Sequence, residues 1–273
     1  ILGPSTNARN ADIRVRLVSQ EKLDPGRRIP EARPKVPSWG RPLREPDVWG
    51  ELFGRTGSRW VSVGDCCDIR RGMTSGKDGY FYPRDVTRET LERHPGDREF
   101  RDATGHGRSP FEGGKLQLIS CAVDGSQHAV EAEFLEPLVH GPLDLDSFHV
   151  PTADARRWVL WLPAGAAPGP HLSRYLRHGE RLGIPDRPTC VARASRSRRG
   201  YDLARPPGRG LLWPKERQFR HLVPANRSGW AVNCRLYEIR PGSPDRLLLW
   251  AGIFNSTWAL LSSVVHGRPV GAE

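Results

Sequence analysis

The chain has 273 residues, which is enough to bury a core and to form one large domain or two small ones. A hydrophobic fraction of 37 %, together with 25 prolines and 29 glycines, predicts a loop-rich, mixed α+β fold with short strands and few helices. No run of about 18 apolar residues is present, which excludes a single membrane-spanning helix. The formal net charge of +11 favours a nucleic-acid partner; the alternative is a solvated basic surface that follows from an arginine-rich composition.

The five cysteines give no pattern of a disulfide framework or a metal site. They are odd in number, and the sequence contains no Cys-x-x-Cys pair and no Cys/His quartet with zinc-ligand spacing. Reduced thiols packed as small apolar groups are typical of a cytoplasmic protein. The sequence therefore predicts a cytoplasmic location and no metal ion in this chain.

Two segments precede the main domain, which we place at residues 60–273. Residues 11–18 alternate apolar and charged side chains, which predicts a strand with one exposed face. Residues 24–59 contain six prolines and scattered charge, a composition typical of a partly extended linker. We therefore expect a separate segment at 1–22 and a proline-rich linker at 23–59.

A glycine-rich loop follows a predicted short strand at Val61–Val63 and a second apolar segment at Ile69. Glycines bring main-chain N–H groups close to a ligand, and neighbouring cations and hydroxyls suit a polyanion, of which DNA is the commonest large example. The loop residues are the glycines Gly72, Gly76 and Gly79, the cations Arg70, Arg71 and Lys77, and the hydroxyls Thr74 and Ser75. The alternative is an ordinary glycine-rich hairpin in which the two hydroxyls form caps or turns.

The remaining elements follow from periodicity. Strands are predicted at 116–123, 158–162, 211–213 and 231–239. Helices are predicted at 86–93 and 171–179, with a short helix or turn at 131–140. The longest predicted helix is 245–265, where apolar residues recur every three or four positions near the C-terminus.

Positive charge is densest between Arg193 and Arg220, where nine Lys and Arg stand against Asp202 and Glu216. Cations in such a cluster can contact phosphates and fix the register of a protein on DNA. The candidates here are Arg196, Arg198, Arg199, Lys215 and Arg217. The alternative for each of them is a solvated surface cation.

Four blocks in order resemble a known family. The first block, at 64–82, reads Gly-Asp-x-x-Asp-Ile-Arg-Arg-Gly-x-Thr-x-Gly and ends in Phe-Tyr; the second, Tyr-Leu-Arg-His-Gly-Glu, stands at 175–180. The third runs from Leu-Leu-Trp-Pro-Lys-Glu to Leu-Tyr-Glu-Ile at 211–239. The fourth runs from Ile-Phe-Asn-Ser-Thr to Gly-Arg-Pro-Val-Gly at 253–271. Together they resemble the C-terminal target recognition domain of adenine-specific DNA methyltransferases from bacterial restriction-modification systems. The resemblance covers roughly residues 60–273. It adds His266 and Arg268, in the Gly-Arg loop of the last block, to the expected DNA contacts; the alternative there is a simple helix stop at Gly267.

The resemblance implies sequence-specific recognition of double-stranded DNA, with methyl transfer from S-adenosylmethionine by a catalytic domain in cis or in trans. Residues 1–22 would be the tail of that catalytic domain. A restriction nuclease is a further expected partner, and a membrane is not. The chain itself shows neither an S-adenosylmethionine loop nor an Asn-Pro-Pro-Tyr tetrapeptide, so we expect no catalytic residue and no cofactor within it.

Three alternatives stay open from the sequence: a stand-alone specificity subunit that recruits separate modification and restriction subunits, a degenerate DNA-binding remnant, and, last, an RNA-binding module. The DNA-binding reading makes one geometric demand. The loop at 70–77 and the arginines near residue 200 must border the same cationic surface.

Overall fold

The computed structural model describes residues 61–266, apart from 152–154, 156, 164–165, 195–199, 202, 204–207 and 217–219, and in addition Glu51 and Arg55. The chain divides into two compact units, one of residues 67–251 and one of residues 1–66 and 252–273. Short strands in small sheets alternate with short helices, so the predicted α+β class is confirmed. The predicted segment 1–22 and nearly all of the linker 23–59 lie outside the described residues.

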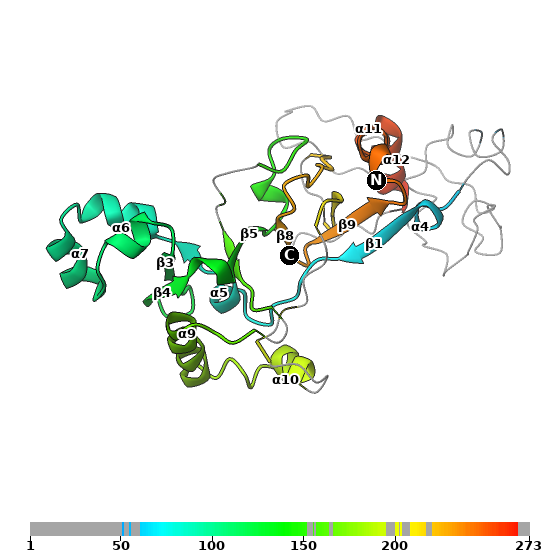
Figure 1. The fold of residues 1–273 in the computed structure, drawn as a ribbon. Helices are drawn as coiled ribbons and strands as arrows, with labels where there is room; N and C mark the ends of the chain where they lie inside the picture. The colour runs from blue at the N-terminus through cyan, green and yellow to red at the C-terminus, as the bar shows by residue number, and fades with distance from the viewer. Residues whose placement is uncertain are drawn as a thin grey trace, which may run out of the picture. The chain divides into compact units, whose positions relative to one another are not determined.

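The first sheet of the larger unit joins the two ends of that unit. Strand β9 lies between β1 and β7 and pairs antiparallel with both (Figure 1). The strands are β1 (Cys67–Arg71), β7 (Leu211–Pro214) and β9 (Leu236–Pro241). Arg71 and Trp213 both lie opposite Tyr237, so β1 and β7 end at the same end of the sheet. The polypeptide segments that follow these two strands therefore begin next to each other.

The second sheet is antiparallel, and helices cover it. Its strands are β2 (Arg84–Asp85), β3 (Leu116–Ser120) and β4 (Gln127–Glu131), and the connection from β2 to β3 forms α6 (Thr87–Arg93), α7 (Asp97–Thr104) and α8 (Ser109–Glu112). Phe100 and Phe111 from these helices pack with Leu118 of β3 in a small core. Helix α9 (Pro170–Arg181) contacts β4, and the Glu131 carboxylate accepts hydrogen bonds from the amides of His171 and Leu172 at 2.9 and 2.8 Å. A strand-end carboxylate thus satisfies the free amides of the first turn of α9.

The third sheet pairs β5 (Leu135–Val139) antiparallel with β6 (Trp158–Leu160) and parallel with β8 (Ala231–Val232). It follows β4 through a single 3-10 turn, η2 (Ala132–Phe134), and a second one, η3 (Pro142–Asp144), comes after β5. The predicted helix or turn at 131–140 is therefore wrong, because most of that segment is a strand. Pro137 misled the prediction; it sits in β5 opposite Trp158.

The main core lies where the short helix α5 (Asp78–Phe81) meets α9. The rings of Tyr80 and Tyr175 stack at 4.6 Å with an interplanar angle of 6°. Each phenol donates to the backbone carbonyl of the other residue, at 3.0 and 2.7 Å. A Cβ at Gly179 would lie 2.4 Å from the Tyr80 hydroxyl oxygen, so a glycine is needed here to make room for the ring. The helix end predicted at residue 179 is wrong, because α9 continues to Arg181.

Ser256 divides the predicted long helix 245–265. The segment forms η4 (Pro244–Arg246), α11 (Leu247–Phe254) and α12 (Thr257–His266). The Ser256 hydroxyl donates to Ile253 O at 2.6 Å and accepts from the Ala259 amide at 3.2 Å, which caps the start of α12. Among the described residues no single helix is long and apolar enough to cross a membrane; Pro244–Phe254 and Thr257–Val265 meet that test only as a pair, bent by 67° at their junction.

Other predicted elements agree with the structure to within a few residues, or differ for local reasons. The strand predicted at Val61–Val63 is wrong, because Val63 starts the short helix α4 (Val63–Cys66). The strand predicted at 231–239 is two strands, β8 and β9, because residues 233–235 turn between them. Helix α10 (Pro188–Ala194), which the sequence analysis missed, lies in the larger unit.

Candidate nucleic-acid interface

Residues 72–77, called the glycine loop from here on, leave β1 at the shared end of the first sheet. The Gly72 amide donates to Leu236 O at 3.0 Å and the Met73 amide to Val232 O at 2.6 Å. A Cβ at Gly72 would lie 2.2 Å from Asn233 O, a backbone atom that cannot move independently. Only glycine allows this approach, so Gly72 fixes the direction in which the loop departs.

The glycine loop then crosses the first turn of α10. Gly76 has a φ of +90°, in the left-handed region that favours glycine, and a Cβ there would lie 2.8 Å from Cβ of Thr189. Gly79, inside α5, packs less tightly, with its nearest contacts at 3.4 Å. Two of the three predicted loop glycines are thus required by close approach or by conformation, whatever ligand the loop binds.

Arg193 of α10 holds the glycine loop through its guanidinium group. Its Nη1 donates to Thr74 O at 2.9 Å, its Nη2 to Ser75 O at 2.8 Å and its Nε to Gly200 O at 2.9 Å. The same guanidinium lies 5.2 Å from the centre of the Phe81 ring. Three carbonyl partners and an aromatic ring occupy this cation, so it positions the loop and leaves phosphate contacts to other side chains.

The two predicted hydroxyls differ in what they face. Thr74 is exposed, whereas Ser75 is 1 % exposed. The Ser75 hydroxyl donates to Oδ1 of Asp78 and accepts from the Lys77 amide at 3.1 Å. Asp78 in turn lies 3.3 Å from Nε2 of His140. The structure thus gives Ser75 the turn-forming role that the sequence left as an alternative, and leaves Thr74 as the exposed hydroxyl of the loop.

The cations at the end of β1 are exposed and only partly paired. Nε of Arg70 lies 2.9 Å from Oδ2 of Asp68, which Nη2 of Arg240 also reaches at 2.7 Å. Nε of Arg71 donates to Cys234 O at 3.3 Å. One carboxylate therefore faces two guanidinium groups, and a local excess of positive charge remains beside the glycine loop.

Glu238 of β9 is buried beneath these cations. It lies opposite Arg70 in the strand register and accepts a hydrogen bond from the Gly210 amide at 2.9 Å through Oε1, while its Oε2 has no hydrogen-bond partner. Burial raises the pKa of the Glu238 carboxyl, although the Gly210 amide and the Arg240 and Arg70 charges act in the opposite direction. The first sheet therefore carries a buried acid whose charge costs free energy.

Lys215 follows β7 and is exposed, with Nζ 3.5 Å from Oε1 of Glu216. Because β1 and β7 end at the same end of the sheet, Lys215 and the glycine loop both start there. Lys77 is half-buried. Arg70, Arg71 and Lys215 thus lie at one end of the first sheet, from which the glycine loop with Thr74 and Lys77 departs.

The other predicted contacts are not in this group. Arg196, Arg198, Arg199, Arg217 and Arg268 lie outside the described residues, and His266 ends α12 in the smaller unit. The segment 195–199 is nevertheless flanked by two residues, Arg193 and Gly200, that meet beside the glycine loop. The sequence analysis missed the positioning role of Arg193, because its partners at residues 74 and 75 are more than a hundred positions away in the chain.

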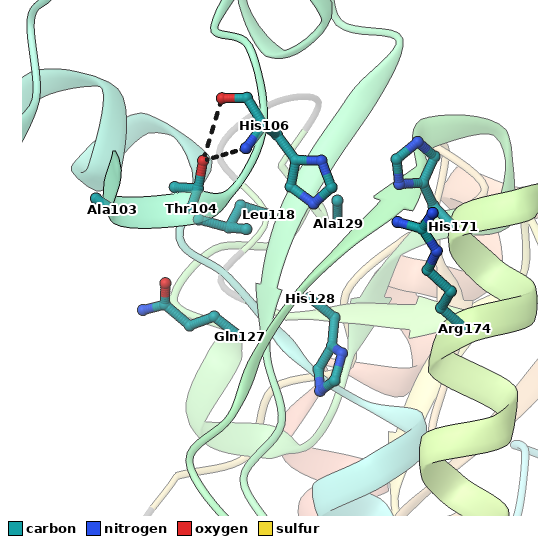
Figure 2. A pocket seen from close by; sticks show the side chains of 9 residues that line it. All are labelled: Ala103, Thr104, His106, Leu118, Gln127, His128, Ala129, His171 and Arg174. Carbon is teal, nitrogen blue, oxygen red and sulfur yellow. Dashed lines mark hydrogen bonds between the residues drawn. The ribbon is translucent and has the colours of Figure 1, made fainter. Parts of the chain in front are cut away.

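A separate pocket of about 150 Å³ lies between α7, the β3–β4 strands and α9. His106, His171 and Arg174 line it (Figure 2). Burial, together with the neighbouring His171 and Arg174, lowers the pKa of His106. The pocket is smaller than the ~300 Å³ at which small-molecule sites usually begin.

Comparisons of the chain with protein-family models and with curated proteins gave no match. No protein-family model matches the chain. No curated protein matches it at the required significance. The functional conclusion therefore depends on the residues themselves.

Proposed function

We propose that residues 67–251 bind duplex DNA through the glycine loop, the exposed end of β1 and the arginine-rich segment after α10. The observation that carries this proposal is the grip of Arg193 on the carbonyls of Thr74, Ser75 and Gly200. This contact joins the loop to both flanks of the arginine-rich segment. It supports the expectation that the glycine loop and those flanks border one surface.

The charges support the same proposal. Exposed Arg70, Arg71 and Lys215 at one sheet end can contact phosphates, while Thr74 presents a hydroxyl beside them. The side chains of Arg193 and Ser75 form hydrogen bonds within the protein, and these bonds keep the loop in one conformation. A preorganised loop loses less conformational entropy when it binds a ligand.

Within this proposal the chain is the target recognition part of an adenine-specific DNA methyltransferase of a restriction-modification or phage-defence system. The catalytic domain, in cis or in trans, would bring S-adenosylmethionine and flip the target adenine. Such a protein works on DNA in the cytoplasm. A separate restriction nuclease is the further partner that this role implies.

A titration of DNA binding against salt tests the proposal. The fluorescence anisotropy of a labelled duplex should give a linear fall of log K with log salt concentration, since each neutralised phosphate contributes about 0.9 to the slope. The double variant Arg70→Ala/Arg71→Ala should weaken binding and reduce the slope by about 2. A slope near zero for the wild-type chain would instead support the degenerate remnant.

The matched control is Arg93→Ala, because Arg93 is also an exposed arginine but pairs with Glu89 at 2.7 Å on α6. It should leave both affinity and slope unchanged. A loss per removed charge that is equal in the control and in the double variant would show that net charge alone, and not the β1 end, drives binding. Co-elution with a separate methyltransferase polypeptide would favour the stand-alone specificity subunit.

A further inference from the structure

Three potential metal ligands of the larger unit converge between the β3–β4 turn and α9. A ligand atom of Cys121, of Asp124 and of His178 all lie within 4.8 Å of one another. Cys121 and Asp124 belong to the turn at 121–126, whereas His178 belongs to the last turn of α9. Nε2 of His178 lies 3.0 Å from Oδ2 of Asp124. The three groups therefore come from two elements that are distant in sequence.

A fourth potential ligand, His128 of β4, faces the same point. The Ser126 hydroxyl oxygen lies 2.8 Å from Nε2 of His128, 3.1 Å from Nε2 of His178 and 2.7 Å from Oδ1 of Asp124. The two imidazole rings are 4.4 Å apart between their centres. Figure 2 shows the His128 ring extending away from His106 and His171. His128 therefore lines the small pocket and also lies beside His178, with the Ser126 hydroxyl between the two rings.

The cluster joins a buried thiol to an exposed carboxylate, and the hydroxyl and the amide of Ser126 both donate to Oδ1 of Asp124, at 2.7 and 3.1 Å. Cys121 is fully buried, while Asp124 is exposed and opens the cluster to solvent. An ion could enter past Asp124 and reach the thiol.

We propose that Cys121, Asp124, His128 and His178 bind one Zn²⁺ ion that cross-links the β3–β4 turn to α9. One sulfur, two imidazole nitrogens and one carboxylate oxygen form a ligand set that zinc prefers, and four protein ligands leave no open position for catalysis. As the sulfur–zinc bond forms, the Cys121 thiol gives its proton to solvent, and the proton on Nε2 of His178, which lies 3.0 Å from the Asp124 carboxylate, is exchanged through solvent to Nδ1, so that Nε2 can bind the ion. The Ser126 hydroxyl, which now occupies the centre, moves outward and donates to the carboxylate of Asp124.

Metal titration of the full chain tests this proposal without DNA. After treatment with a chelator, the protein should take up one Zn²⁺ per chain and unfold at a higher temperature with the ion than without it. Co²⁺ in its place should give the visible bands of a tetrahedral ion and a thiolate-to-cobalt charge-transfer band. Cys121→Ser should remove the charge-transfer band and weaken zinc binding by more than about 100-fold, beyond the loss typical of outer-sphere changes.

The matched control is Cys66→Ser, which removes a thiol of the smaller unit and should change neither the band nor the affinity. His128→Asn tests the fourth ligand; an unchanged affinity would overturn its assignment. Should Cys121→Ser fail to fold, X-ray absorption at the zinc edge of the wild-type chain decides, with one sulfur and three nitrogen or oxygen ligands expected. A self-satisfied polar cluster without stoichiometric zinc, or zinc bound with no sulfur, would overturn the proposal.

Discussion

Two turns of the larger unit fasten a strand to a helix, and they use different chemistry. The glycine loop is held to α10 by the guanidinium of Arg193, which donates to neutral backbone carbonyls. The turn at 121–126 is held to α9 by Asp124, Ser126 and His178, whose side-chain oxygen and nitrogen atoms are of the types that metal ions bind. The first attachment uses up its polar groups and leaves the loop as a fixed platform. The second keeps groups that a cation can use.

This contrast explains why the two regions invite different ligands. A platform of fixed backbone with cations at its edge suits an extended polyanion, since phosphates are met one by one along a surface. A compact convergence of three ligand atoms, with His128 beside them, suits one small ion. Mutations that break one attachment should leave the other intact, and the predictions below use this separation.

Gly72→Ala should have the largest effect. Its Cβ would lie 2.2 Å from Asn233 O, and the obstacle is backbone, so we expect a loss of about 3 kcal/mol in the free energy of unfolding. Urea denaturation measures this loss. Gly252→Ala is the control, because a Cβ there meets nothing within 4 Å and the site is helical, so stability should stay equal or rise by up to about 1 kcal/mol. Similar losses in both variants would contradict the close-approach argument.

Arg193→Lys keeps the charge but cannot reach three carbonyls at once. We expect a loss of about 2 kcal/mol in stability and faster amide hydrogen exchange in the glycine loop, with unchanged exchange in the turn at 121–126. Mass spectrometry of exchanged peptides follows both regions in one experiment. If exchange in the loop stays slow while DNA binding falls, Arg193 acts on the ligand directly and its positioning role is wrong.

Ser126→Ala removes the hydroxyl at the centre of the second attachment. In chelator-treated protein it should cost about 1 kcal/mol, because Asp124 and both imidazoles lose a shared partner. Saturating Zn²⁺ should reduce that cost, because the ion replaces the Ser126 hydroxyl as the shared partner of Asp124 and the two imidazoles. Thermal unfolding with and without zinc measures the difference. A cost that is equal in the two conditions would separate Ser126 from the ion site.

Glu238→Gln should have the smallest effect, and the effect should depend on pH. A carboxyl whose pKa is raised by folding supports stability at low pH, and this support is lost as pH rises from the unfolded value of 4.5 through the folded value. The variant should therefore gain stability relative to wild type as the pH rises above 4.5. Denaturant titrations across that range test the trend; a constant difference would mean that Glu238 does not titrate in the sheet.

The local pattern predicted those elements that depend on neighbours in the chain. The local pattern predicted strand β7 to within one residue, helix α9 to within two and strand β3 to within three. It failed where distant groups decide the conformation. Pro137 enters a strand because β6 pairs with it, and Gly179 continues a helix because the Tyr80 ring needs its space.

The candidate sites divide in the same way. The glycines, cations and hydroxyls around residues 70–77 are contiguous in sequence, so the loop could be found there. Arg193 could not, because nothing local distinguishes it from other arginines. The proposed zinc site is partly visible in the sequence, because Cys121, Asp124 and His128 lie within eight residues. Its remaining ligand, His178, comes from another element. A search for paired cysteines passes over such a mixed set.

The reciprocal tyrosine pair has an optical consequence. Burial raises the pKa of Tyr80 and of Tyr175 far above the usual phenol range, as it does for Tyr82. In alkali, Tyr80 and Tyr175 should therefore ionise, and absorb as phenolates, only after α5 separates from α9. The ultraviolet absorbance of these two tyrosines thus reports the separation of α5 from α9 without an added dye.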